Sequence, residues 1–150
     1  MLKGIDPRLT AEILYALRAM GHGDCLVIAD RNFPADSIAQ RTATGALLRM
    51  DNLTAPQAAE AILSVMPLDS FVEDFAGRME VIGAQAEIPA VQAEVQAIVD
   101  AAEGAHRPIP GVERHAFYDL ARGAYAVIQT GEARFYGNFM FRKGVIPPEA

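Results

Sequence analysis

Apolar residues recur every three or four positions in several segments of the chain, which is the spacing of one face of a helix. In the first such segment, residues 10–20, Thr10 is suited to cap the helix N-terminus. Gly21 and Gly23 follow the last apolar position and are expected to end the helix. Three further segments are predicted to be helical: residues 54–66, 88–103 and 114–122.

Other apolar runs are short and bounded by turn residues, as expected of buried strands. The two clearest runs cover residues 24–30 and 124–129. Weaker strand patterns cover residues 41–50, 78–83 and 138–142, and residues 32–36 are predicted to form a loop. Strands mixed with helices along the chain are typical of a layered α/β domain. We therefore expect residues 1–150 to form a single domain of this class.

Composition and charge narrow the range of partners. The 150 residues are 51% hydrophobic and 21% charged, which is ordinary for a globular protein. Thirteen Lys and Arg against nineteen Asp and Glu give a formal net charge of −6, which disfavours binding to nucleic acid and to anionic membranes. No apolar run approaches the roughly 18 residues of a membrane span, and the first fifteen residues do not resemble a signal peptide. We therefore expect a cytoplasmic protein without nucleic-acid or membrane partners.

The chain contains one cysteine, Cys25, so it cannot form an intrachain disulfide. A lone cysteine fits a reducing compartment. Cys25 could act as a nucleophile, but its position in an apolar run is more typical of a small buried hydrophobic residue.

His22 is the first candidate for chemistry. It stands between two glycines, so no neighbouring side chain shields its imidazole from a ligand. An imidazole with an unperturbed pKa of about 6.5 can donate and accept protons near neutral pH. The alternative is a structural role at the C-terminal end of the preceding helix, where the helix dipole stabilises a cation.

Carboxylate, guanidinium, phenol and amide groups complete the list of candidates. Asp30 ends the first clear strand, and carboxylates at such positions often line ligand sites in α/β proteins, although a turn or cap role is the alternative. Asp69 has the same two interpretations. Arg114 and Tyr118 form one polar and aromatic cluster, and residues 136–138 form another. Both clusters could bind sugar hydroxyls or could simply pack in the fold.

Several familiar motifs are missing from the sequence. It lacks the glycine-rich nucleotide-binding motifs, a C-x-x-C pair and the G-x-S-x-G nucleophile elbow. Its three histidines do not have zinc-ligand spacing. The remaining groups favour proton transfer on a small polyol, without a metal or other cofactor.

Taken in order, these motifs resemble those of the L-fucose mutarotase family, which is related to the ribose pyranases. The similarity begins at residues 1–5 and covers nearly the whole chain. Residues 40–52 and 73–111 depart from the family pattern, which affects the expected substrate preference more than the reaction type. The segments that carry the resemblance most specifically are Met20-Gly21-His22-Gly23-Asp24, Phe33-Pro34-Ala35, Thr130-Gly131-Glu132 and Tyr136-Gly137-Asn138.

The resemblance implies an enzyme that opens and closes a sugar ring and so interconverts the α and β anomers, with L-fucose as the expected substrate. It implies a three-layer α/β domain with a central mixed sheet, in a ring-shaped homo-oligomer that is usually a decamer. A ribose-type pyranase and a non-catalytic monosaccharide-binding protein are the alternatives. The residues that match the family's functional positions are His22 as the catalytic residue, and Asp30, Asp69, Arg114, Tyr118, Tyr136, Gly137 and Asn138 as substrate-binding residues.

Opening a hemiacetal requires removal of a proton from O1 and delivery of a proton to the ring oxygen O5. General acid–base catalysis of such steps typically contributes about 10²–10⁴-fold. We expect His22 to act as the acid or base, and Asp30 to orient His22 or to bind a sugar hydroxyl. Arg114 is expected to bind hydroxyls or to stabilise developing negative charge on oxygen.

Overall fold

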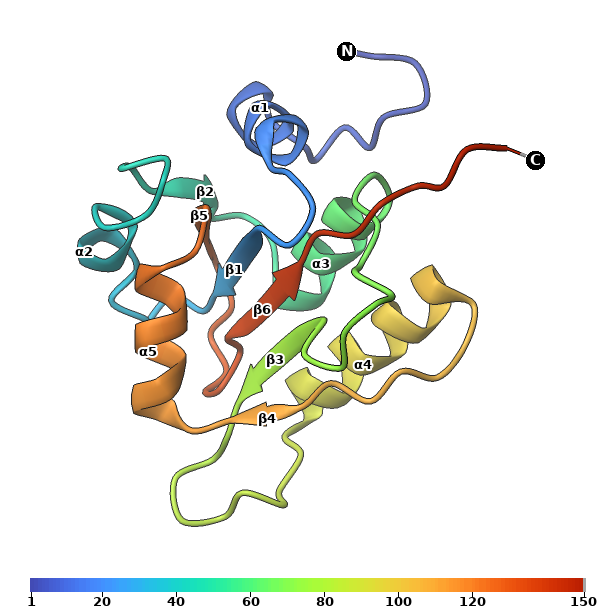
Figure 1. Cartoon of the computed structure of the whole chain (residues 1–150). Helices are drawn as coiled ribbons and strands as arrows, with labels where there is room; N and C mark the ends of the chain where they lie inside the picture. The colour runs from blue at the N-terminus through green and yellow to red at the C-terminus, as the bar shows by residue number, and fades with distance from the viewer. Residues whose placement is uncertain (150) are drawn as a thin grey trace.

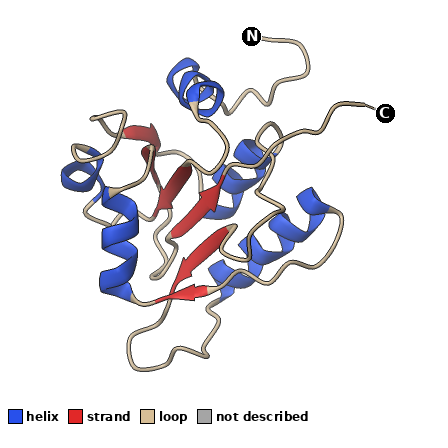
Figure 2. Ribbon diagram, viewed as in Figure 1, coloured by secondary structure: helices blue, strands red, loops and turns tan. Residues whose placement is uncertain are grey.

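The structure of the protein, a computed structural model, describes residues 1–149 and contains one six-stranded sheet with helices on both faces (Figures 1 and 2). The elements in chain order are α1 (Ala11–Ala19), β1 (Cys25–Ala29), α2 (Ala35–Ala39), β2 (Leu48–Met50), α3 (Ala55–Leu63), β3 (Ala76–Met79), α4 (Ala90–Glu103), β4 (Gly111–Val112), α5 (Arg114–Arg122), β5 (Ala126–Thr130) and β6 (Phe139–Arg142).

The sheet is mixed, with strand order β2-β5-β1-β6-β3-β4. β1 lies at its centre, parallel to β5 and antiparallel to β6. Because β6 runs against β1, the residues just before β6 lie beside the end of β1, and the residues just after β6 lie beside its start. This antiparallel pairing places two groups of loops at opposite ends of the sheet.

Side chains of β1 alternate between two hydrophobic cores, as the two-residue repeat of a strand requires. Leu26 and Ile28 belong to a core with α1, α3 and α4, whereas Val27 and Ala29 belong to a core with α2 and α5. Helices therefore cover both faces of the sheet. The predicted α/β domain with a central mixed sheet is confirmed.

The four helices predicted from the sequence are present, and α5 has the predicted bounds. α3 begins with a capping box, in which Thr54 accepts a hydrogen bond from the Gln57 amide and the Gln57 side chain accepts one from the Thr54 amide.

Some boundaries were predicted wrongly. Residues 32–36 are not all loop, because the short helix α2 begins at Ala35 and buries Ile38 against the second core. Five residues are too few to show a helical period. The strand expected over residues 78–83 ends at Met79, the strand expected over 41–50 covers only Leu48–Met50, and the two-residue strand β4 was not predicted.

Within residues 1–149, none of the helices combines the length and apolar character needed to cross a lipid bilayer.

Candidate functional site

His22 lies in the loop between α1 and β1, and the residues after β6 hold this loop in place. Nζ of Lys143 donates hydrogen bonds to the carbonyl oxygens of Leu17 (2.7 Å) and Met20 (2.5 Å), which belong to the C-terminal end of α1. The amide of Gly23, with φ of 87°, donates to the carbonyl of Lys143. The imidazole remains about half exposed on this fixed loop.

Asp69 is the hydrogen-bond partner of His22. Its Oδ2 lies 3.1 Å from Nε2 of His22, and its Oδ1 accepts a hydrogen bond from the Phe71 amide at 3.0 Å. The Phe71 amide lowers the pKa of Asp69, burial opposes this, and the contact with His22 lowers the pKa further, with a net shift below the usual value. An ionised Asp69 therefore orients the imidazole. The expectation that Asp30 orients His22 is wrong, because the partner carboxylate is Asp69.

The backbone of Asp69 is fixed against the same end of β6. Its amide donates to the carbonyl of Arg142 at 3.0 Å, and Nη2 of Arg107 donates to its carbonyl at 2.8 Å. Gly144 passes so close to this loop that a Cβ there would collide with the carbonyl oxygen of Leu68. A glycine at position 144 is therefore needed to bring Asp69 to this place.

Asp30 lies at the opposite end of β1 and is 3% exposed. Its Oδ1 accepts hydrogen bonds from the amides of Asn32 (3.0 Å) and Phe33 (2.9 Å), as in a turn cap. Its Oδ2 accepts from Nδ2 of Asn138 (3.1 Å) and from the amide of Gly137 (3.3 Å). Burial raises the pKa of Asp30, although these donors oppose the shift.

A cavity of about 220 Å³ opens beside Asp30. At its rim, Nε of Arg114 donates to the hydroxyl of Tyr118 at 3.0 Å, and the hydroxyl of Tyr136 accepts from the amide of Ile82 at 3.3 Å. Two asparagine amides and several aromatic and aliphatic side chains form the rest of its wall. The lining residues are Asp30, Asn32, Phe33, Met79, Ile82, Arg114, Tyr118, Phe135, Tyr136 and Asn138.

Most of the predicted substrate-binding residues thus come together around one cavity. Gly137 packs between Asp30 and Glu132, where a Cβ would meet Cγ of Glu132 at 2.8 Å and Cβ of Asp30 at 3.4 Å. The exception is Asp69, which lies with His22 at the other end of the sheet.

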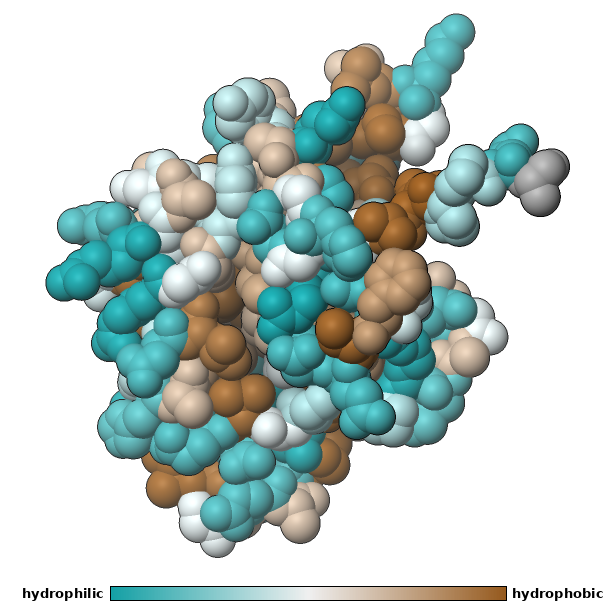
Figure 3. Space-filling view, in the orientation of Figure 1, coloured by the Kyte–Doolittle hydropathy of each residue, from teal (hydrophilic) through white to brown (hydrophobic). Residues whose placement is uncertain are grey.

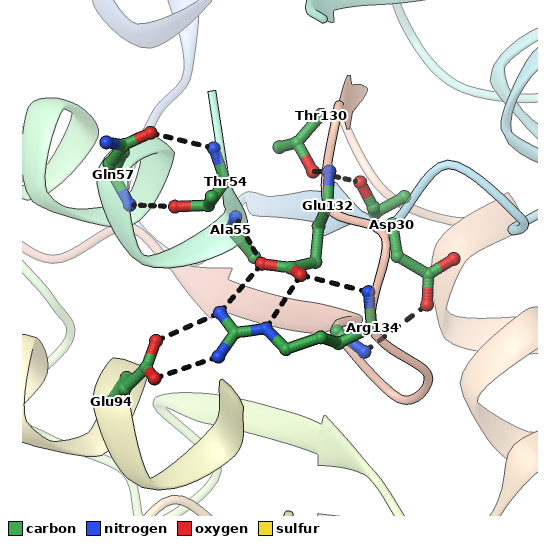
Figure 4. A network of polar contacts seen from close by, with 10 residues as sticks. Asp30, Thr54, Ala55, Gln57, Glu94, Thr130, Glu132 and Arg134 are labelled. Carbon is green, nitrogen blue, oxygen red and sulfur yellow. Dashed lines mark hydrogen bonds and ion pairs between the residues drawn. The ribbon is translucent and has the colours of Figure 1, made fainter. Parts of the chain in front are cut away.

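The sequence did not identify the residues that hold the cavity-lining loop between β5 and β6 in place. Glu132, 2% exposed, accepts hydrogen bonds from Nε of Arg134 (2.9 Å) and from the amide of Ala55 at the N-terminus of α3 (3.1 Å). Arg134 also donates two hydrogen bonds to Glu94 of α4 (Figure 4). The network fixes the loop between β5 and β6 that carries Tyr136. The only sequence signal was the segment Thr130-Gly131-Glu132, which carries part of the family resemblance.

The imidazole and the cavity are far apart within one chain. His22 precedes β1 and Asp30 follows it, and five strand residues at about 3.3 Å each span roughly 17 Å. A sugar in the cavity therefore does not reach the His22 of the same chain. Among residues 1–149, no three His, Cys, Asp or Glu side chains gather closely enough to hold a metal ion.

Comparison with known proteins identifies relatives of this chain. Over 149 residues the chain is 44% identical to a fucose mutarotase of Homo sapiens, covering 97% of this chain and 94% of the relative. The crystal structure of protein Atu2016 shares 58% identity and a TM-score of 0.96, covering 98% of this chain and 97% of that one.

A third relative has been solved with a sugar. The crystal structure of the fucose mutarotase from Streptococcus pneumoniae in complex with L-fucose is 33% identical, with a TM-score of 0.87. The match covers 97% of this chain and 100% of that one. The family model described as the RbsD / FucU transport protein family matches residues 3–146. The chain therefore belongs to the RbsD / FucU family.

Proposed function

We propose that the protein is a mutarotase that interconverts the α and β anomers of L-fucose. The observation that carries this proposal is an imidazole oriented by a carboxylate, together with a small cavity lined by hydroxyl-binding groups. Relatives named fucose mutarotase match nearly the full length of the chain and support the choice of sugar. The reaction needs neither a metal nor a nucleotide, and we place it in the cytoplasm.

The separation of His22 from the cavity supports a site that is completed between subunits. In a head-to-tail contact, each copy presents one surface to a different surface of the next copy, and such contacts form a ring when the rotation between copies closes. The end of the sheet with His22 and Asp69 would then face the cavity of the neighbouring copy. A ring of this kind, with a decamer as the expected assembly, gives every cavity an imidazole.

Exposed aromatic side chains at both ends support this contact. Phe71, which is 72% exposed, lies beside the imidazole with ring centroids 5.6 Å apart. Phe135, 74% exposed, and Ile82 border the cavity. Figure 3 shows apolar atoms at the lower end of the molecule, below the strands β3 and β4 of Figure 1. Large exposed apolar groups often mark contact surfaces, and a head-to-tail contact would cover both sets.

The contact with Asp69 decides which imidazole nitrogen reacts. A carboxylate only accepts hydrogen bonds, so it holds the proton of the neutral imidazole on Nε2. Nδ1 then carries the free lone pair and can take the O1 proton of the sugar. The imidazolium formed in this way delivers a proton to O5 as the C1–O5 bond breaks, the aldehyde carbonyl rotates, and the ring closes on its other face with the proton transfers reversed.

The cavity residues hold the sugar during these steps. Arg114 donates hydrogen bonds to hydroxyls and stabilises negative charge that develops on oxygen. The hydroxyls of Tyr118 and Tyr136 fix the orientation of the ring. Asn138 and Asp30 bond to each other through two hydrogen bonds and thereby keep the base of the cavity rigid.

Exchange between α- and β-L-fucose, measured by NMR with micromolar protein, tests the proposal. An exchange rate equal to that of buffer would refute it. Binding of L-fucose without acceleration would favour a non-catalytic sugar-binding protein. Faster conversion of D-ribose than of L-fucose would favour a ribose-type pyranase.

A further inference from the structure

Gln92 is a buried polar side chain that the proposed reaction does not use. It lies in the first turn of α4 and is 1% exposed. Its Nε2 donates hydrogen bonds to the carbonyl oxygens of Met79 (2.7 Å) and Tyr136 (3.1 Å), and its Oε1 accepts from Nη1 of Arg78 at 3.3 Å. Both amide hydrogens and the amide oxygen are therefore engaged.

Both carbonyl groups belong to walls of the cavity. Met79 ends β3 and Tyr136 opens the segment before β6, and both residues line the cavity. These walls are also joined by the hydrogen bond from the Met79 amide to the carbonyl of Asn138, at 3.1 Å. Gln92 thus holds together two segments that are far apart in the sequence.

Tyr136 needs such support because of its backbone conformation. Its φ is 63°, and it is the only non-glycine residue with positive φ among residues 1–149. A tyrosine pays an energetic cost in this region and stays there only where its surroundings hold it. The hydrogen bond from Gln92 to its carbonyl is one of these restraints.

We propose that Gln92 is a positioning residue for sugar binding, which acts through Tyr136 and does not touch the sugar. The inference rests on the proposed function, because the sugar is the ligand of this cavity. The His22–Asp69 pair lies at the other end of the sheet and has its own supports in Lys143 and Arg107. Loss of Gln92 therefore weakens sugar binding and leaves the proton transfer unchanged.

The test uses two substitutions and a matched control, with KM and kcat for L-fucose anomer exchange measured by NMR. Q92M keeps the side-chain length and removes every hydrogen bond, and Q92E keeps the size and the acceptor for Arg78 but loses the amide donor. For both we expect KM to rise about tenfold, with kcat within about twofold of wild type, as when binding alone is lost. The control is V95A, on the same buried face of α4, which we expect to lower the melting temperature without changing KM.

An unchanged KM in Q92M overturns the inference, and so does a rise in KM of V95A equal to that of Q92M, because the effect would then be general destabilisation. If Q92M does not fold, Q92E decides in the same way. A wild-type protein without mutarotase activity would refute the proposed function instead. The dissociation constant for L-fucose, measured by titration of the same variants, would then replace KM.

Discussion

Nε2 of His22 and Oδ2 of Asp69 lie 3.1 Å apart on two loops that meet at the C-terminal end of β6, because β6 runs antiparallel to both β1 and β3. Asp69 is buried, whereas the imidazole is about half exposed. This pair has the geometry of an oriented acid–base catalyst, but the cavity with the hydroxyl-binding groups lies at the far end of β1.

The first prediction concerns subunit complementation. H22A lacks the imidazole, and R114M alters the exposed rim of the cavity, so each variant alone should lose most activity. In a ring mixed at equal ratio, about a quarter of the head-to-tail contacts join an intact imidazole to an intact cavity. Mixing with subunit exchange should therefore restore about a quarter of the wild-type rate, measured by NMR anomer exchange.

The control for this experiment is H22A mixed with the double variant H22A/R114M, which contains no intact imidazole. If the mixture of single variants is no more active than the sum of its parts, the shared site is refuted.

The second prediction concerns the imidazole tautomer. In D69N, Oδ1 can still accept the Phe71 amide, but the amide nitrogen now faces Nε2 of His22 and donates to it. The proton of the neutral imidazole then moves to Nδ1, so the reacting lone pair is lost. We expect kcat to fall by about 10²-fold, with a melting temperature near that of wild type. A variant with wild-type kcat would show that Asp69 does not orient His22.

The third prediction concerns Gly144. In G144A the new Cβ would meet the carbonyl of Leu68 and lie 2.9 Å from Cα of Asp69, so the backbone must move. We expect a loss of stability of about 1–3 kcal/mol and a lower kcat, because Asp69 shifts away from His22. Urea denaturation and anomer exchange measure the two effects. G123A is the control, since the nearest atom to its Cβ is 3.7 Å away, and it should behave as wild type.

The fourth prediction concerns stability and pH. Burial raises the pKa of Glu132, but the Arg134 side chain and the amides of Arg134 and Ala55 outweigh it, so the net pKa lies below the usual value. E132Q should lower the free energy of unfolding by about 2–3 kcal/mol at pH 7. This is less than expected for a fully buried pair, because Arg134 is partly exposed and retains its ion pair with Glu94. E94Q, at the exposed end of the network, should cost less than about 1 kcal/mol.

The sign of the pH effect follows from the lowered pKa. The stabilisation by Glu132 is complete above the unfolded-state pKa of about 4.3 and is lost as the pH falls through the folded-state pKa. The difference in unfolding free energy between wild type and E132Q should therefore shrink below about pH 4, as measured by urea denaturation at pH 7 and pH 3.5. A constant difference across this range would contradict the assignment.

Local patterns in the sequence were sufficient to predict many of the helices and strands. Helical spacing predicted α1 and α4, and apolar runs bounded by turn residues predicted β1 and β5, because each of these elements is long enough to show its pattern. The short elements α2 and β4 have too few residues to repeat any pattern, and only packing against the sheet defines them.

For the candidate site, too, some features follow from the local sequence and others only from packing. The sequence by itself determined the kinds of chemical group available: an accessible imidazole, carboxylates, an arginine, and phenol and amide groups, in an order that resembles one family. Only the tertiary structure decided that Asp69 and not Asp30 partners His22, that Gln92 and Glu132 support the cavity, and that the imidazole lies at the other end of β1 from it. Strand direction and loop contacts between distant segments set these relations, and no local pattern in the sequence encodes them.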